Sequence, residues 1–166
     1  MFRRMFRIVP FAVFCGSAVA IAGADGKDSV PELNQKVLAF ATSNLGKQVG
    51  NGECWTLADE ALAAAGAQRP HQGGYGALEF GRELKPNESL LPGDVLQFTK
   101  TKLVSKSGSW VEMALHTAIV AGVKGTKVDV LHQNWSDQRR VTRFRFDLSE
   151  LTEGKVQRFR PQLARE

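Results

Sequence analysis

The stretch Leu90–Phe98, which reads LLPGDVLQF, divides the chain into two parts of different character. Before it, apolar residues recur at spacings of three and four, which is the period of an amphipathic helix. After it, short runs rich in valine, isoleucine, threonine and phenylalanine are separated by glycine and aspartate, which is typical of strands. Helices followed by strands without further helices predict an α+β domain with a mostly antiparallel sheet.

Two helices are expected before this divide. Ser29–Glu32 (SVPE) has the features of a helix start, namely a serine cap, a proline in the first turn and a glutamate three residues on, and Gly46 is a suitable end. A second helix is predicted over Cys54–Ala65, with Gly66 ending it. Residues 66–94 are expected to be mostly loop.

Five strands are expected after the divide. The segment between the first two, Lys100–Glu112, is predicted to be an insertion that forms either a basic lip of a groove or a solvated hairpin. The strands are predicted at residues 95–98, 114–121, 127–135, 140–146 and 155–160.

The first residues of the chain carry a different pattern. Three arginines precede an apolar run from Ile8 to Ala22 that ends in small residues, which is the layout of a secretory signal peptide. The run is shorter than the roughly 20 residues that a membrane span needs. We therefore predict a signal peptide over residues 1–22, cleaved by about residue 24, and one domain over residues 30–160. The expected location is secreted or periplasmic, with no stable membrane span after cleavage.

The net charge and the number of cysteines limit the classes of function that the chain can have. Removing the three leader arginines lowers the formal net charge from +5 to +2, which is too small to indicate a nucleic-acid partner. Cys15 would leave with the leader, so that Cys54 remains as the single cysteine. A lone cysteine is an intermolecular bridge, a buried small hydrophobe or a reactive thiol. No metal or cofactor is expected, because one cysteine and scattered histidines do not form a zinc pattern.

Cys54 follows a glycine-containing turn in the stretch Gln48–Trp55 (QVGNGECW), at the expected start of a helix. Unpaired amide donors at a helix start favour a thiolate, although Cys54 could equally be the first residue of a buried apolar stripe. A catalytic cysteine needs a base that is held by a third polar group. His116 opens an apolar strand, and His132 and Asn134 lie two residues apart on one face of the next. If the two strands pair, a polar side chain lies beside His116. The alternative to a catalytic arrangement is a buried histidine whose hydrogen bonds are satisfied, next to an exposed asparagine.

The stretch QVGNGECW resembles the active-site opening of papain-like cysteine peptidases. Residues 116–123 (HTAIVAGV) resemble their histidine strand, and residues 132–136 (HQNWS) resemble their asparagine segment. The separation of 62 residues between Cys54 and His116 is similar to that in the compact NlpC/P60 and CHAP cell-wall hydrolases. The resemblance implies a papain-like fold of the NlpC/P60-CHAP type, with N-terminal helices packed on the sheet.

Two segments of the sequence depart from those families. NlpC/P60 proteins usually have Asp-Cys-Ser-Gly where this chain has Glu53–Thr56 (ECWT), and CHAP proteins often have a glutamate and an asparagine where it has His132 and Asn134. The third catalytic residue and the substrate therefore stay open between the two subfamilies.

The resemblance implies a secreted cysteine peptidase or amidase that acts as a monomer on peptidoglycan peptide or N-acetylmuramoyl-alanine amide bonds. Cys54 would attack the carbonyl, His116 would take its proton, and His132, or alternatively Asn134, would orient His116. The backbone N–H of Cys54, with the side chain of Gln48, would hold the oxyanion. Two alternatives are a non-catalytic cell-wall or glycan binding module on the same fold and a thiol acyltransferase.

Overall fold

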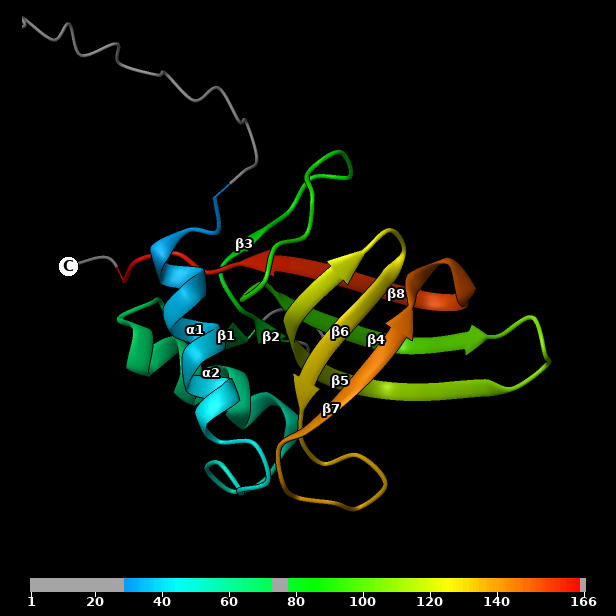
Figure 1. Cartoon of the computed structure of the whole chain (residues 1–166), viewed down its shortest axis with the longest axis horizontal. Helices are drawn as coiled ribbons and strands as arrows, with labels where there is room; N and C mark the ends of the chain where they lie inside the picture. Colours follow the sequence, from blue (N-terminus) through cyan, green and yellow to red (C-terminus); the bar gives the residue numbers. More distant parts are fainter. Residues whose placement is uncertain (1–28, 73–77, 165–166) are drawn as a thin grey trace, which may run out of the picture.

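The computed structural model describes residues 29–72 and 78–164, and it has two helices on one side and a curved sheet on the other (Figure 1). The predicted signal peptide lies outside the described residues. In the part of the chain that is described, no helix is long and apolar enough to cross a membrane.

The two helices are α1, Glu32–Ser43, and α2, Cys54–Ala65. The second has the predicted bounds, because Gly66 adopts a left-handed φ of 74° and closes it. The predicted serine cap of the first helix is wrong. Pro31 occupies the cap position without a side-chain bond, and its carbonyl accepts the first helical N–H, from Gln35 at 3.0 Å.

The main sheet is antiparallel throughout and has six strands in the order β3-β8-β4-β5-β6-β7. The last strand in sequence, β8, therefore lies inside the sheet. A separate pair is formed by β1, His71–Gln72, and β2, Leu78–Glu79. The six strands are β3 Arg82–Glu83, β4 Val95–Val104, β5 Trp110–Lys124, β6 Lys127–His132, β7 Thr142–Asp147 and β8 Leu151–Arg160, with a short 3-10 helix at Leu148–Glu150 before the last.

The segment Lys100–Glu112 is a continuation of the sheet. Its residues extend β4 and β5 into a long hairpin whose last pair is Val104 with Trp110. The predicted strand over residues 127–135 ends early, at His132. Asn134 has a φ of 58°, in the left-handed region, and this breaks the alternation that would have kept it on the face of His132.

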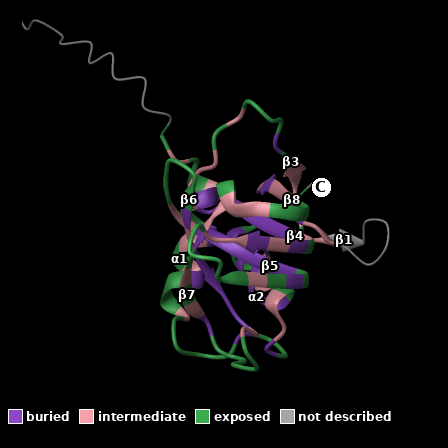
Figure 2. Cartoon of the chain, turned by 90° about the vertical axis from the view of Figure 1, so that its right-hand side faces the viewer, coloured by how far each residue is buried: buried purple, intermediate pink, exposed green. Residues whose placement is uncertain are grey.

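The core is divided by the sheet into two clusters, which we call the helix-side core and the strand-side core. Val95, Ile119 and Leu131 pack against α2 in the helix-side core, and their neighbours in sequence, such as Leu96 and Ala118, belong to the strand-side core. The alternation follows from the period of two along a strand. Figure 2 shows the buried residues concentrated in the central strands and in the parts of the helices that face them.

The stretch that divides the sequence also joins the two parts of the fold. Asp94 is fully buried and accepts hydrogen bonds from Asn34 of α1 at 2.8 Å and from Arg160 at the end of β8 at 2.9 Å. Gly93 has a φ of 85°, and a Cβ at this position would lie 2.1 Å from the carbonyl oxygen of Asn34. The turn before β4 is therefore packed directly against the first helix.

Candidate active site

Cys54 is the first residue of α2, and its side chain is half-buried. The turn before it uses two left-handed glycines, Gly50 at a φ of 56° and Gly52 at 84°. The thiol lies against the backbone N–H and the hydroxyl of Thr117 on β5. The helix start is thus held against the strand that carries His116, at the residue next to it.

His116 and His132 are joined by a hydrogen bond of 2.9 Å between Nε2 of the first and Nδ1 of the second. Both side chains are buried in the strand-side core, and their rings stand at 87° to one another. The ring of Trp135 covers both, with centroids 5.2 Å away in each case. The histidine that the sequence suggested as orienting residue is therefore in contact with His116.

The structure does not join Cys54 and His116 directly. Within residues 29–72 and 78–164 no hydrogen bond connects the thiol to the imidazole, and Nδ1 of His116 has no hydrogen-bond partner. His132 therefore holds one ring nitrogen of His116 and leaves the other nitrogen unengaged.

Asn134 has a different partner from the one considered in the sequence. Its amide donates to the Glu53 carboxylate at 2.8 Å, and Arg139 forms an ion pair with the same carboxylate at 3.1 Å. Asn134 therefore holds the residue before Cys54.

Gln48 is bound within its own turn. Its amide donates to the Gly50 carbonyl at 3.4 Å, and its Cδ lies 3.2 Å from the position that a Cβ on Gly52 would take. The backbone N–H of Cys54 lies in the first turn of α2, where amide groups have no partner within the helix. Of the two expected oxyanion donors, the backbone group is the one that needs no rearrangement.

Burial sets the protonation states of the site. It raises the pKa of the Cys54 thiol above the ordinary value of 9.0; contacts with Thr117 and Trp55 oppose this rise, and the charge of Glu53 adds to it. Burial also lowers the pKa of His116 to about 3, with a further contribution from His132, and lowers the pKa of His132 to about 4. At neutral pH the thiol and both imidazoles are therefore neutral, contrary to the expectation of a thiolate at the helix start.

Gln133 is a residue that the sequence analysis missed. It is fully buried on the face opposite to that of His132, and its side chain makes four bonds to the segment around Cys54. These are with the N–H and carbonyl of Val49, at 3.1 and 2.9 Å, the carbonyl of Glu53, at 2.7 Å, and the hydroxyl of Thr56, at 3.0 Å. Its position between two polar candidates on an alternating strand was the available signal, because it must face the other side.

Metal-ligating side chains are not clustered in the described residues. No group of three or more His, Cys, Asp or Glu side chains there could hold a metal ion.

A comparison with protein families identifies the domain. Residues 29–165 match the AIM3/BBC1 cysteine proteinase-fold domain. The chain belongs to this family. A protein of Debaryomyces hansenii named Altered inheritance of mitochondria protein 3 is 30% identical over 149 residues, which cover 80% of this chain but only 16% of that protein.

Two solved structures of Ly7917 are similar in fold. The first has a TM-score of 0.51 at 16% identity and covers 78% of this chain and 62% of the other. The second, described as Ly7917 with the hydrolyzing product of MDP, has a TM-score of 0.50 at 16% identity and covers 77% and 62%. The chain thus has a papain-like cysteine proteinase fold, with an antiparallel sheet and two helices in the residues that the structure describes. The narrower assignment to NlpC/P60 or CHAP does not follow from these matches.

The prediction of a secreted or periplasmic location is wrong. It is contradicted by the match to a Debaryomyces hansenii protein named for the inheritance of mitochondria, which are organelles inside cells. The prediction rested on an apolar run preceded by arginines, and such a short compositional pattern is not specific to export.

Proposed function

We propose that this domain is a cysteine-dependent hydrolase of amide bonds in peptides, with Cys54 as nucleophile, His116 as base and His132 as the residue that orients His116. The observation that carries the proposal is the 2.9 Å bond between His116 Nε2 and His132 Nδ1, with the Cys54 thiol lying against Thr117, the residue next to His116. A nucleophile near a base that is itself held by a third group is the general arrangement of such sites.

The protonation states favour general-base catalysis over a pre-formed ion pair. With His132 accepting from Nε2–H, the free Nδ1 of His116 can accept the thiol proton as sulfur attacks the carbonyl carbon. The C–N bond breaks as His116 returns this proton to the leaving nitrogen, and water then hydrolyses the thioester. The Cys54 N–H would stabilise the oxyanion.

Attack requires the thiol to turn from Thr117 toward Nδ1 of His116. Catalytic hydrogen bonds are often long or unformed without substrate and tighten in the complex. The proposal therefore includes a rotation of the Cys54 side chain on substrate binding.

Labelling with an epoxysuccinyl peptide, followed by intact mass, tests the pair without knowledge of the natural substrate. We expect one adduct on Cys54, and a rate reduced about 10²- to 10⁴-fold in His116→Ala, the usual effect of a missing general base. His132→Ala should be slowed more than Asn134→Ala, because only His132 contacts the base. Equal rates in the wild type and His116→Ala would remove His116 from the mechanism.

A non-catalytic binding module remains the second candidate. The raised pKa of Cys54 and the missing bond between the thiol and His116 favour it. Hydrolysis of a quenched fluorescent peptide library by the wild type but not by Cys54→Ser would decide for the enzyme. Addition of a free amine separates a hydrolase from an acyltransferase, since only the latter forms the new amide.

The peptidoglycan substrates are not part of this proposal. They were implied by cell-wall hydrolases that act outside the cell, and the predicted secreted location is contradicted. The structure of Ly7917 with a hydrolysis product of MDP is in keeping with a hydrolytic use of the fold.

A further inference from the structure

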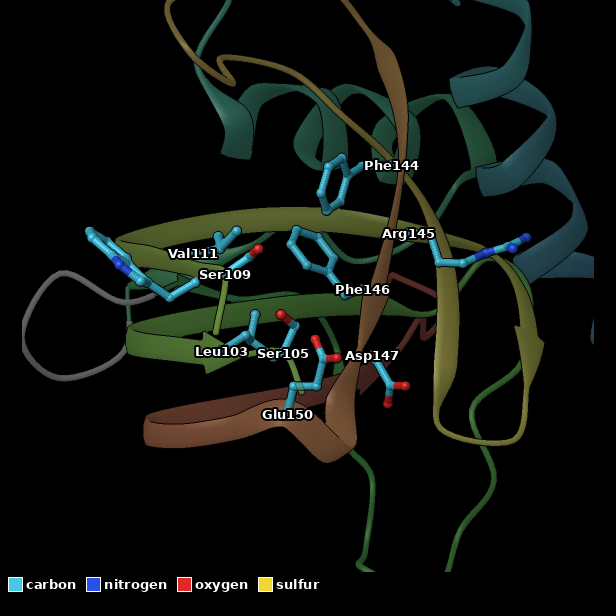
Figure 3. Close-up of a pocket in the computed structure, with 10 residues that line it drawn as sticks. Leu103, Ser105, Ser109, Val111, Phe144, Arg145, Phe146, Asp147 and Glu150 are labelled. Carbon is cyan, nitrogen blue, oxygen red and sulfur yellow. The ribbon is translucent and has the colours of Figure 1, made fainter. Parts of the chain in front are cut away.

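Two pockets adjoin along the β4–β5 hairpin and share Trp110 and Val111. The first, of about 380 Å³, includes His116 in its lining and therefore belongs to the site described above. The second, of about 130 Å³, lies farther along the hairpin, between β5 and the end of β7 (Figure 3).

The two pockets are joined by a row of aromatic rings. Trp135 lies 5.2 Å from His116 between ring centroids, Phe144 lies 5.3 Å from Trp135, and Phe146 lies 4.7 Å from Phe144. Figure 3 shows Phe144 and Phe146 directed into the second pocket, where Leu103 and Val111 face them. A continuous row of ring contacts thus leads from the proposed base to the second pocket.

The size of the second pocket suits one side chain. Sites for drug-sized ligands usually measure about 300–1,000 Å³, well above the volume found here. Its opening carries Trp110, which is 59% exposed although it is a large apolar residue. Such an exposed aromatic beside an apolar hollow is typical of a surface that contacts a ligand.

Three ionised side chains line the second pocket, namely Arg145, Asp147 and Glu150. Glu150 points into the pocket in Figure 3 and has no ion pair within the described ranges. Arg145, the one cation in the lining, points away and is held by both oxygens of Asp129 at 2.7 and 2.9 Å. Asp147 also points away in Figure 3, and its carboxylate accepts from the N–H and the hydroxyl of Ser149 at 3.1 and 2.6 Å. Lys102, whose Nζ lies 5.3 Å from the centroid of the Trp110 ring, is paired with Glu112 at 2.9 Å. The carboxylate of Glu150, which has no ion pair in the described residues, therefore favours a cationic neighbour for the apolar group that enters.

From these observations we infer that the second pocket is a substrate subsite that receives a large apolar side chain of a peptide, with a lysine or arginine directly next to it in the peptide. The inference rests on the proposed peptide hydrolase and names its substrate class. The aromatic row fixes the path between the two pockets, and Glu150 fixes the preferred charge.

Binding of labelled peptides to the full chain carrying Cys54→Ala tests the subsite without turnover. The probes are acetyl-Gly-Lys-Phe-Lys-Gly amide, the same peptide with alanine for phenylalanine, and the same peptide with glutamate for both lysines, followed by fluorescence anisotropy. Loss of the phenyl ring should weaken binding at least tenfold, because apolar burial is lost. Loss of the cations should weaken it about two- to fivefold at low salt and little at high salt.

Protein variants test whether the peptides bind in this pocket. Glu150→Gln should abolish the preference for lysine over glutamate, and Val111→Trp, which fills the hollow, should abolish the preference for phenylalanine. Glu153→Gln is the matched control, since Glu153 is also an exposed carboxylate near the hairpin but does not line the pocket. Unchanged preferences in Glu150→Gln and Val111→Trp, or equal binding of all three peptides, would overturn the subsite.

The proposed hydrolase and the proposed subsite can be refuted independently of each other. Selective binding that depends on Glu150, with no cleavage by the wild type, would refute the hydrolase and support a peptide-binding pocket. Cleavage by the wild type without preference for an apolar residue beside a cation would support the hydrolase and refute the subsite.

Discussion

The thiol of Cys54 lies between two opposing influences. The helix start and the N–H groups of Thr117 and Trp55 favour a thiolate, while burial and the carboxylate of Glu53 oppose it, and burial is the largest effect. The environment of this residue thus keeps the thiol protonated at neutral pH.

Removal of the Glu53 charge should make Cys54 more reactive. In Glu53→Gln, iodoacetamide alkylation of Cys54 followed by mass spectrometry against pH should have its midpoint at lower pH than in the wild type, because one contribution that raises the thiol pKa is gone. Glu60→Gln on the same helix is the control and should leave the midpoint unchanged. An unshifted midpoint in Glu53→Gln would show that this carboxylate does not act on the thiol.

Gln133 should be important for stability. Gln133→Leu leaves the N–H of Val49 without its side-chain partner, which costs about 1–3 kcal/mol, and it removes the bonds to the carbonyls of Val49 and Glu53, each worth about 0.5–1.5 kcal/mol. We expect a loss of about 3 kcal/mol in the free energy of unfolding, measured by urea denaturation. Gln157→Leu, on β8 with a single bond to Glu83 at 3.3 Å, should change it by less than about 1 kcal/mol. Similar losses in the two variants would contradict the role of Gln133.

At the scale of elements, the turn before β4 determines how the first helix meets the sheet. Gly93→Ala should lower the free energy of unfolding by more than about 3 kcal/mol, because it combines a left-handed φ with a clash against the Asn34 carbonyl. Gly125→Ala separates the two effects, since Gly125 has a φ of 61° and open space around its Cβ position. It should cost about 1–2 kcal/mol by conformation alone. Equal costs would mean that the contact with α1 adds nothing.

Elements with local signals were predictable from the sequence. The second helix was predicted with its observed bounds because its apolar stripe and Gly66 lie within one short stretch. The strands were recognisable by composition, but their order was not. β8 pairs with β4, whose paired residues lie 48 to 64 positions earlier, and local periodicity carries no information about such a partner.

In the candidate site, too, contacts between regular strand segments were predictable from the sequence, and contacts that depend on irregular backbone or on tertiary packing were not. The contact between His116 and His132 could be predicted, because both lie on regular strand segments. The contact of Asn134 with Glu53 could not, since it depends on a left-handed residue just after β6. The raised thiol pKa also could not, because burial of Cys54 comes from packing against β5 and not from its neighbours in sequence.

At the scale of the whole molecule, the two buried histidines make stability depend on pH. Their pKa values are about 3 and about 4 in the folded chain, below the ordinary 6.5. Below pH 6.5 the unfolded chain therefore binds more protons than the folded chain, and stability falls as pH falls through the window down to those values. Between pH 7 and pH 5 we expect a loss of about 2–4 kcal/mol, from urea denaturation.

A variant tests whether the histidines cause this loss. His116→Gln with His132→Gln is less stable at pH 7 but should show a shallower pH dependence between pH 7 and 5, since neither glutamine titrates. A slope equal to that of the wild type would assign the acid sensitivity to other groups.

The place of β8 inside the sheet has a consequence for the way the protein is made. A ribosome delivers β4 before β8, so β4 has the hairpin partner β5 on one side and no partner on the other until residues 151–160 have been added. At about 5–20 residues per second this takes on the order of several seconds. During that time the nascent chain exposes a long unpaired strand edge, which is a template for association with other chains. The interval in which this domain is most prone to aggregate therefore falls within its own translation, and slower elongation over the codons that follow β4 would lengthen it.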